Sequence, residues 1–199
     1  DVSGSMHSPV TGNRGVATTK VRCIDVAGLV TAAMLRKNGN ATVLPFATDV
    51  VPLRHAMNAL DSVVSNAELL ASLPSGGTAC AAPIRWLNAH GQAPDLVVVI
   101  SDSQSWADFA LTPTQTSVQL GLVQGTVMAE EWEKLRTKNP GAKLVLIDLQ
   151  PYATTQVQNR QDVLNVGGFS DAVFDVIDSF VKNDTTGEGF LQAIESISI

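Results

Sequence analysis

The sequence contains few cysteines, a single tyrosine and no long apolar run. No run approaches the ~18 apolar residues that a membrane-spanning helix needs, so we expect a soluble protein. Its two cysteines, Cys23 and Cys80, have neither the CxxC spacing of a metal site nor a disulfide framework around them. They are typical of buried thiols in a reducing compartment, which favours the cytoplasm. A chain of 199 residues suits one α/β domain and is short for two.

Positive charge is also scarce, and common catalytic motifs are missing. Lys and Arg number 13 against 19 Asp and Glu, a net charge of −6 that argues against a nucleic-acid-binding surface over the whole domain. Residues 1–37 sum to +3 and the remainder to −9, so only the N-terminal part tolerates anions. The chain has no G-x-S-x-G elbow, no HExxH and no P-loop.

Helical and strand patterns alternate along the chain. Residues 95–102 (DLVVVISD) and 142–149 (AKLVLIDL) are nearly continuous apolar runs, as in strands buried on both faces. Residues 41–47 (ATVLPFA) also predict a strand, with a bulge or edge-like position at Pro45. Helical spacing occurs at 18–37, 67–73, 82–89, 124–137 and 171–182. We therefore expect an α/β fold, a Rossmann-like, doubly wound, mostly parallel sheet with helices on both faces.

The first six residues, DVSGSM, place a carboxylate and two hydroxyls on alternate positions. In an extended segment Asp1, Ser3 and Ser5 point the same way and can converge if the backbone turns at Gly4. Converging hard oxygens suit Mg²⁺, for which they would supply half a coordination shell. The alternative is helix capping, in which such side chains accept backbone N–H bonds.

Two further oxygen ligands fall where ligand sites form in parallel sheets. Asp102 ends the strand 95–102, and Thr78 lies in the glycine-rich loop PSGGTAC. Ligands of α/β sheets bind at the carboxyl ends of strands. Capping explains any one of these residues but does not predict all of them at one edge of the sheet.

This three-part pattern resembles the von Willebrand factor A (vWA) domain and its metal-ion-dependent adhesion site. The carriers of the resemblance are DVSGS, the Thr of SGGTAC and the Asp of VVISDSQ. Within that superfamily, LPSGGTACAAPIRWL and LNVGGFSDAVFDVIDSFV are similar to the C-terminal A domain of Ro (TROVE-module) ribonucleoproteins, bacterial type. The resemblance implies a single vWA-like domain over residues 1–199 that lacks its first central strand, upstream of Asp1. It also implies bound Mg²⁺ (or Mn²⁺), with Asp1, Ser3, Ser5, Thr78 and Asp102 as the metal residues.

The resemblance further implies a non-catalytic binding module of a Ro-like RNA-binding protein, involved in noncoding (Y) RNA binding and RNA quality control. RNA would bind mainly through an upstream helical-repeat ring that is absent here. The metal would take an acidic or phosphate ligand, and an exoribonuclease would be one kind of protein partner. The likeness is weakest across residues 103–124, a loop-like stretch that is longer than in the animal relatives.

Other functions stay open at this point. One is a vWA protein–protein interaction or adhesion module unrelated to RNA. Another is a phosphatase with Asp1 as nucleophile, but such enzymes need a second acid two residues on, where this chain has Ser3. His7 and Arg14 lie near the metal loop, where Arg14 could meet phosphate. Trp106 could stack on a nucleobase, although packing is the more ordinary role of a tryptophan.

Overall fold

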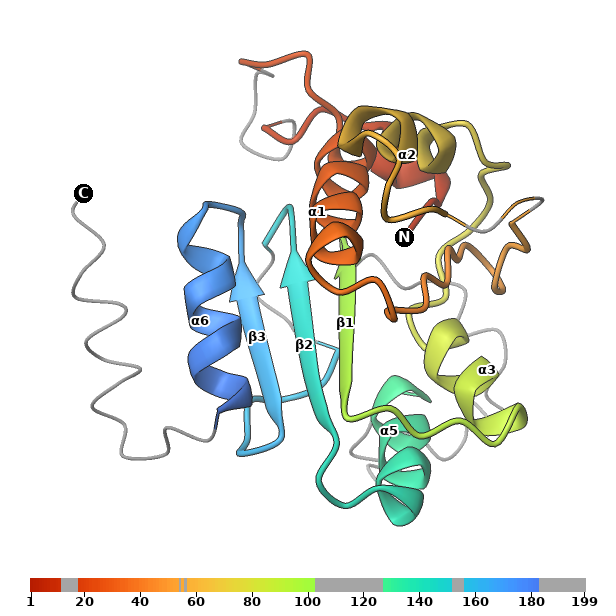
Figure 1. Ribbon diagram of the computed structural model, residues 1–199, viewed down its shortest axis with the longest axis vertical. Helices are drawn as coiled ribbons and strands as arrows, with labels where there is room; N and C mark the ends of the chain where they lie inside the picture. The colour runs from red at the N-terminus through yellow and green to blue at the C-terminus, as the bar shows by residue number, and fades with distance from the viewer. Residues whose placement is uncertain (12–17, 54, 56, 103–126, 152–155, 183–199) are drawn as a thin grey trace, which may run out of the picture.

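The centre of the molecule is a parallel β-sheet. The computed structural model describes residues 1–11, 18–53, 55, 57–102, 127–151 and 156–182. Within these ranges the sheet has the order β1-β2-β3, formed by Leu96–Ser101, Lys143–Asp148 and Val163–Gly167 (Figure 1). Both pairings are parallel, and Ser101 aligns with Asp148 at the carboxyl end. The expected α/β fold with a parallel sheet is confirmed.

Helices cover both faces of the sheet because side chains alternate along each strand. Val97, Val99 and Leu144 pack in one apolar cluster with α3 and α5. Ile100 and Val145 pack in a second cluster with α1 and α6. In the described ranges, no helix is both long and apolar enough to cross a bilayer. The helices are η1 (Gly4–His7), α1 (Cys23–Lys37), α2 (Val63–Ala71), α3 (Ala82–Ala89), α5 (Val127–Lys138) and α6 (Ala172–Val181).

Helix α1 begins five residues later than the sequence pattern predicts. The structure has Arg22 at the N-cap, and Asp25 accepts from the Arg22 backbone N–H in a capping box. Arg22 also forms an isolated antiparallel bridge with Pro9. Residues 18–22 therefore return along the N-terminal loop in an extended form, and the helix starts only at Cys23.

The strand predicted over residues 41–47 is not a ladder strand in the structure. Phe46 forms an isolated antiparallel bridge with Val50, and the Val51 N–H donates to the Pro45 carbonyl at 2.7 Å. Pro45 has no N–H to donate. Among the described residues, no strand lies beside this segment to complete a ladder with it.

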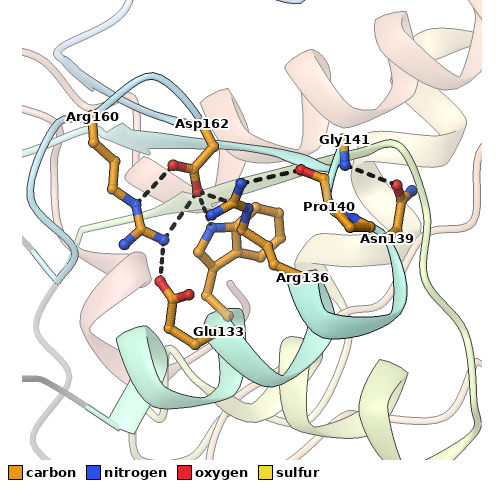
Figure 2. Close-up of polar contacts among 8 residues, drawn as sticks. Glu133, Arg136, Asn139, Pro140, Gly141, Arg160 and Asp162 are labelled. Atoms are coloured by element: carbon orange, nitrogen blue, oxygen red, sulfur yellow. Dashed lines mark hydrogen bonds and ion pairs between the residues drawn. The ribbon is translucent and has the colours of Figure 1, made fainter.

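An ion-pair network joins α5 to the start of β3, at the sheet edge opposite the carboxyl ends of the strands (Figure 2). Asp162 accepts from Trp132 Nε1 at 2.8 Å and pairs with Arg160 Nε at 2.9 Å and Arg136 Nε at 3.3 Å. Arg160 also pairs with Glu133. The Trp132 ring is fully buried, so its only N–H is satisfied by a carboxylate inside the protein. This network holds α5 against the sheet.

Candidate functional site

Three hydroxyl groups from two distant segments meet at the carboxyl end of β1. Ser3 Oγ lies 3.1 Å from Ser5 Oγ, and Ser5 Oγ lies 3.5 Å from Thr78 Oγ1. Ser3 and Thr78 are buried, while Ser5 is half-buried. The short helix η1 makes this possible, because its turn brings Ser5 back beside Ser3.

The Ser3 hydroxyl does not cap the helix that follows it. Ser3 is the N-cap residue of η1, yet its side chain accepts no capping hydrogen bond. Ser62, by contrast, accepts from the Ser65 N–H at 3.0 Å at the start of α2. Capping therefore accounts for Ser62 but not for Ser3, whose hydroxyl contacts Ser5 Oγ.

The Asp1 carboxylate is held on both of its oxygens. Asp1 Oδ1 accepts from the Ser3 N–H at 2.8 Å, and Asp1 Oδ2 accepts from Ser101 Oγ at 2.5 Å. The first contact is a local turn of the kind that Asp commonly forms two residues before a donor. The second crosses from the N-terminal loop to the last residue of β1.

Asp102 completes this edge of the sheet and is 1% exposed. It directly follows Ser101, whose hydroxyl donates to Asp1 Oδ2 at 2.5 Å. A carboxylate removed from water is costly unless donors or a cation compensate it.

Backbone hydrogen bonds fix the loops that bring these side chains together. The Gly4 N–H donates to the Gly76 carbonyl at 2.9 Å, and the Ala79 N–H donates to the Ala47 carbonyl at 2.8 Å. Gln150, which follows β2 and is 5% exposed, donates from Nε2 to the Pro9 carbonyl at 2.8 Å. The N-terminal segment 1–9 is therefore anchored to the glycine loop and to the end of β2.

The side chains of Asp1, Ser3, Ser5, Thr78 and Asp102 offer hard oxygen atoms as their polar groups. Among the described residues, no three His, Cys, Asp or Glu side chains are grouped so as to hold a metal ion. Any cation at this edge must therefore use hydroxyls together with one or two carboxylates. That donor set fits Mg²⁺ or Mn²⁺, which prefer oxygen ligands, better than it fits Zn²⁺, which prefers nitrogen and sulfur.

Sequence reasoning overlooked Ser101 and Gln150, which hold the loop in place. Ser101 is visible in the sequence as a hydroxyl that ends a continuous apolar strand beside Asp102. Gln150 is a polar residue just after the next apolar strand. Both positions lie at strand carboxyl ends, which is the signal that could have found them.

Several other predicted residues lie near the loop or outside the described ranges. His7 Nδ1 accepts from Arg22 Nη1 at 3.2 Å, because a guanidinium can only donate. Cys23 and Cys80 are buried free thiols, as expected, and burial raises the pKa of Cys23 to about 11. Arg14, Trp106 and the 103–124 stretch lie outside the described residues.

A groove of about 840 Å³ runs along β1, on the side of the strand away from β2. Residues 41–46 form one wall and Leu96–Ile100 the other, while Ala27 of α1 and Ile177 of α6 line it from one face of the sheet. Asp1 lies at its end, where the α-amino group donates to the Ile100 carbonyl at 3.0 Å. The next N–H, of Val2, donates to the Phe46 carbonyl at 2.8 Å. The chain at Asp1 thus bridges the two walls.

Comparisons with known proteins agree with this architecture. The family model described as the Ro60 vWA domain matches residues 1–119. The RNA-binding protein RO60 of Deinococcus radiodurans is 27% identical over 185 residues, which cover 92% of this chain and 31% of that protein. The crystal structure of the Deinococcus radiodurans RO (RSR) protein superposes with a TM-score of 0.67 at 24% identity, covering 92% of this chain and 33% of that one. The chain thus spans about a third of the length of both relatives.

The family match includes the N-terminal loop, Thr78 and Asp102, and the structural likeness extends over the parallel sheet and its helices. The chain belongs to the Ro60 vWA domain family.

Proposed function

We propose that this domain is a divalent-metal-binding, non-catalytic interaction module. Asp1, Ser3, Ser5, Thr78 and Asp102 hold Mg²⁺ or Mn²⁺, and an open coordination position takes an acidic or phosphate oxygen from a partner. The observation that carries the proposal is the convergence of three hydroxyls, one of them an N-cap residue that caps nothing. Hydroxyls beside the half-buried Asp1 and the buried Asp102 form a shell that Mg²⁺ accepts while keeping exchangeable waters.

In the whole protein, we propose, this module belongs to a cytoplasmic Ro-like RNA-binding protein that acts on noncoding (Y) RNA and in RNA quality control. Support comes from the family and from the relative named as an RNA-binding protein. The net charge of −6 favours an RNA site elsewhere, on an upstream helical-repeat ring, and leaves this domain for an acidic ligand or a protein such as an exoribonuclease. The alternative is a vWA adhesion module unrelated to RNA.

The contacts of Asp1 argue against an aspartyl-phosphate enzyme. A nucleophilic carboxylate needs an accessible oxygen and a nearby acid for the leaving group. Both oxygens of Asp1 accept hydrogen bonds, and the place of that acid two residues on is taken by Ser3. Asp1 therefore suits a binding role better than a catalytic one.

The groove beside β1 supports a further part of the proposal, that the domain has a central strand immediately before Asp1. A strand there would lie parallel to β1 and receive hydrogen bonds from both walls. Its path is marked by the contacts of Asp1 with Ile100 and of Val2 with Phe46. Because helices line both faces of the groove, such a strand would be apolar throughout.

Calorimetric titration with Mg²⁺ tests the metal proposal. We expect the wild-type chain to bind Mg²⁺ and the Ser3→Ala/Ser5→Ala double variant to lose binding. Ser72→Ala is the matched control, since Ser72 lies at the end of α2, where its Oγ donates to the Leu69 carbonyl at 2.8 Å. No heat from the wild type, or equal affinity in the double variant, would refute the metal site.

Two assays on the same chain separate the competing functions. We expect no turnover of phosphate esters with Mg²⁺ present, whereas the phosphatase alternative requires it. We expect RNA to bind weakly and with steep dependence on salt. Submicromolar affinity for RNA at physiological salt would place the RNA site on this domain. It would contradict the proposal that RNA binds mainly to an upstream helical-repeat ring.

A further inference from the structure

Ser101 is buried at the end of β1 and is not one of the five metal residues. Ser101 is only 2% exposed, and it directly precedes Asp102 in the sequence. Ser101 Oγ donates to Asp1 Oδ2 at 2.5 Å. This hydrogen bond joins the last residue of β1 to the N-terminal loop, which is far from it in the sequence. The bond is charge-assisted, and such bonds are shorter and stronger than those between neutral groups.

The same hydroxyl lies against the segment that carries Thr78. Cys80 Sγ is 3.9 Å from Ser101 Oγ, and Cys80 follows Thr78 by two residues. Ser101 is thus adjacent in sequence to Asp102, bonded to Asp1 and in contact with the segment of Thr78. One side chain touches all three segments that converge at this edge.

The backbone of Ser101 is rigidly placed. Ser101 pairs with Asp148 in the parallel ladder, and its carbonyl accepts from the Leu149 N–H at 2.9 Å. A hydroxyl on a strand of the sheet is held more accurately than one on a loop. Asp1, by contrast, lies on the loop, and the Ser3 N–H on its other oxygen belongs to that same loop.

We propose that Ser101 is a positioning residue of the metal site, which holds the Asp1 carboxylate in the orientation that faces Ser3, Ser5 and Thr78. The inference rests on the proposed function, since it assumes that a divalent cation binds there. Without the Ser101 hydroxyl, the Asp1 carboxylate keeps, within the described part of the chain, the hydrogen bond from the Ser3 N–H of its own loop, and its second oxygen must be ordered when the cation binds. Loss of a hydrogen-bond partner of a metal-site residue typically weakens metal binding about 10- to 100-fold.

The test is Mg²⁺ affinity measured by calorimetry for wild type, Ser101→Ala, Ser101→Thr and the control Ser72→Ala. We expect Ser101→Ala to bind at least about tenfold more weakly. Ser101→Thr keeps the hydroxyl and should restore most of the affinity, while Ser72→Ala should bind like wild type. The free energy of unfolding of each variant in EDTA shows whether the loss of Mg²⁺ affinity is specific to metal binding. A merely structural role of Ser101 would lower the stability of the metal-free protein, and threonine would not restore the affinity.

Wild-type affinity in Ser101→Ala overturns the inference and leaves the metal site intact. Equal weakening in the alanine and threonine variants also overturns it, because the hydroxyl would not be the cause. If wild type itself binds no Mg²⁺, the proposed function and this inference fall together. Should Ser101→Ala fail to fold, Ser101→Cys takes its place. Its thiol fills the space but donates weakly, and wild-type affinity in that variant overturns the inference.

Discussion

At the scale of single residues, the contacts of Ser3 argue against helix capping as its role. Its side chain is buried, makes no capping hydrogen bond and lies 3.1 Å from Ser5 Oγ. A sequence pattern cannot separate capping from metal binding, since Ser before a helical turn fits both. To tell the two roles apart, one must know which groups the Ser3 side chain contacts, and the turn of η1 determines those contacts.

Thr78→Val tests one ligand with almost no change of shape. Valine removes the hydroxyl and keeps the volume, so we expect Mg²⁺ affinity to fall at least about tenfold, or about 1.4 kcal/mol. Stability in EDTA should change by no more than about 1 kcal/mol, because the lost hydroxyl leaves an apolar group of the same shape. Calorimetry and urea unfolding measure both quantities.

Thr137→Val is the matched control. Thr137 lies at the end of α5, where its hydroxyl donates to the Lys134 carbonyl at 2.7 Å. Its loss should leave Mg²⁺ affinity unchanged. If both threonine variants bind Mg²⁺ like wild type, Thr78 is not a ligand.

At the scale of elements, the sequence predicted the strands and helices well where burial dominates. The apolar runs at 95–102 and 142–149 are β1 and β2, shortened by one residue at each end. The pattern at 82–89 is α3 without change. The predictions at 18–22 and 41–47 differ from the structure because tertiary contacts decide there: Arg22 pairs with Pro9, and Phe46 pairs with Val50.

Asp162 is the element-scale contact that we expect to matter most for stability (Figure 2). Asp162→Ala removes the acceptor of the buried Trp132 Nε1 and leaves Arg160 and Arg136 without that partner. An unsatisfied buried donor costs about 1–3 kcal/mol, and we expect a loss in that range in urea unfolding.

Asp178→Ala removes an aspartate of another kind. Asp178 pairs with Lys182 on the exposed side of α6, where ion pairs contribute little. We expect almost no change in stability for Asp178→Ala, and no change in Mg²⁺ affinity for either Asp178→Ala or Asp162→Ala. A loss for Asp178→Ala as large as for Asp162→Ala would contradict this account of the network.

At the scale of the whole molecule, the groove of about 840 Å³ is the main departure from a closed α/β domain. In the part of the chain that the structure describes, β1 has a neighbouring strand on one side, β2. A strand edge left unpaired between two apolar helix layers favours pairing with another strand. The resemblance to vWA domains predicted a strand at this place, whereas periodicity within the chain could not, because the pattern of the visible strands does not show which of their edges is free.

A six-residue extension before Asp1 tests the proposed strand. Alternating Val and Ile should fill the groove and raise the free energy of unfolding by at least about 2 kcal/mol, equivalent to a rise in Tm of about 4–8 °C. A Gly/Ser extension of equal length should have no such effect. Equal stability of the two forms, or dimers of the Val/Ile form in light scattering, would contradict strand insertion within one molecule.

The most direct test of the central claim is thermal melting in EDTA and in millimolar Mg²⁺, for wild type, Asp102→Ala and the control Asp178→Ala. At 100 times its dissociation constant Mg²⁺ should stabilise wild type by about 2.7 kcal/mol, which corresponds to about 5–10 °C. We expect the same rise for Asp178→Ala and none for Asp102→Ala, which removes one of the two carboxylates of the proposed metal site. In EDTA, Asp102→Ala should melt no lower than wild type, because the like charges of Asp1 and Asp102 repel without a cation. An equal Mg²⁺-dependent rise in wild type and Asp102→Ala, or no rise in wild type, would contradict the metal site.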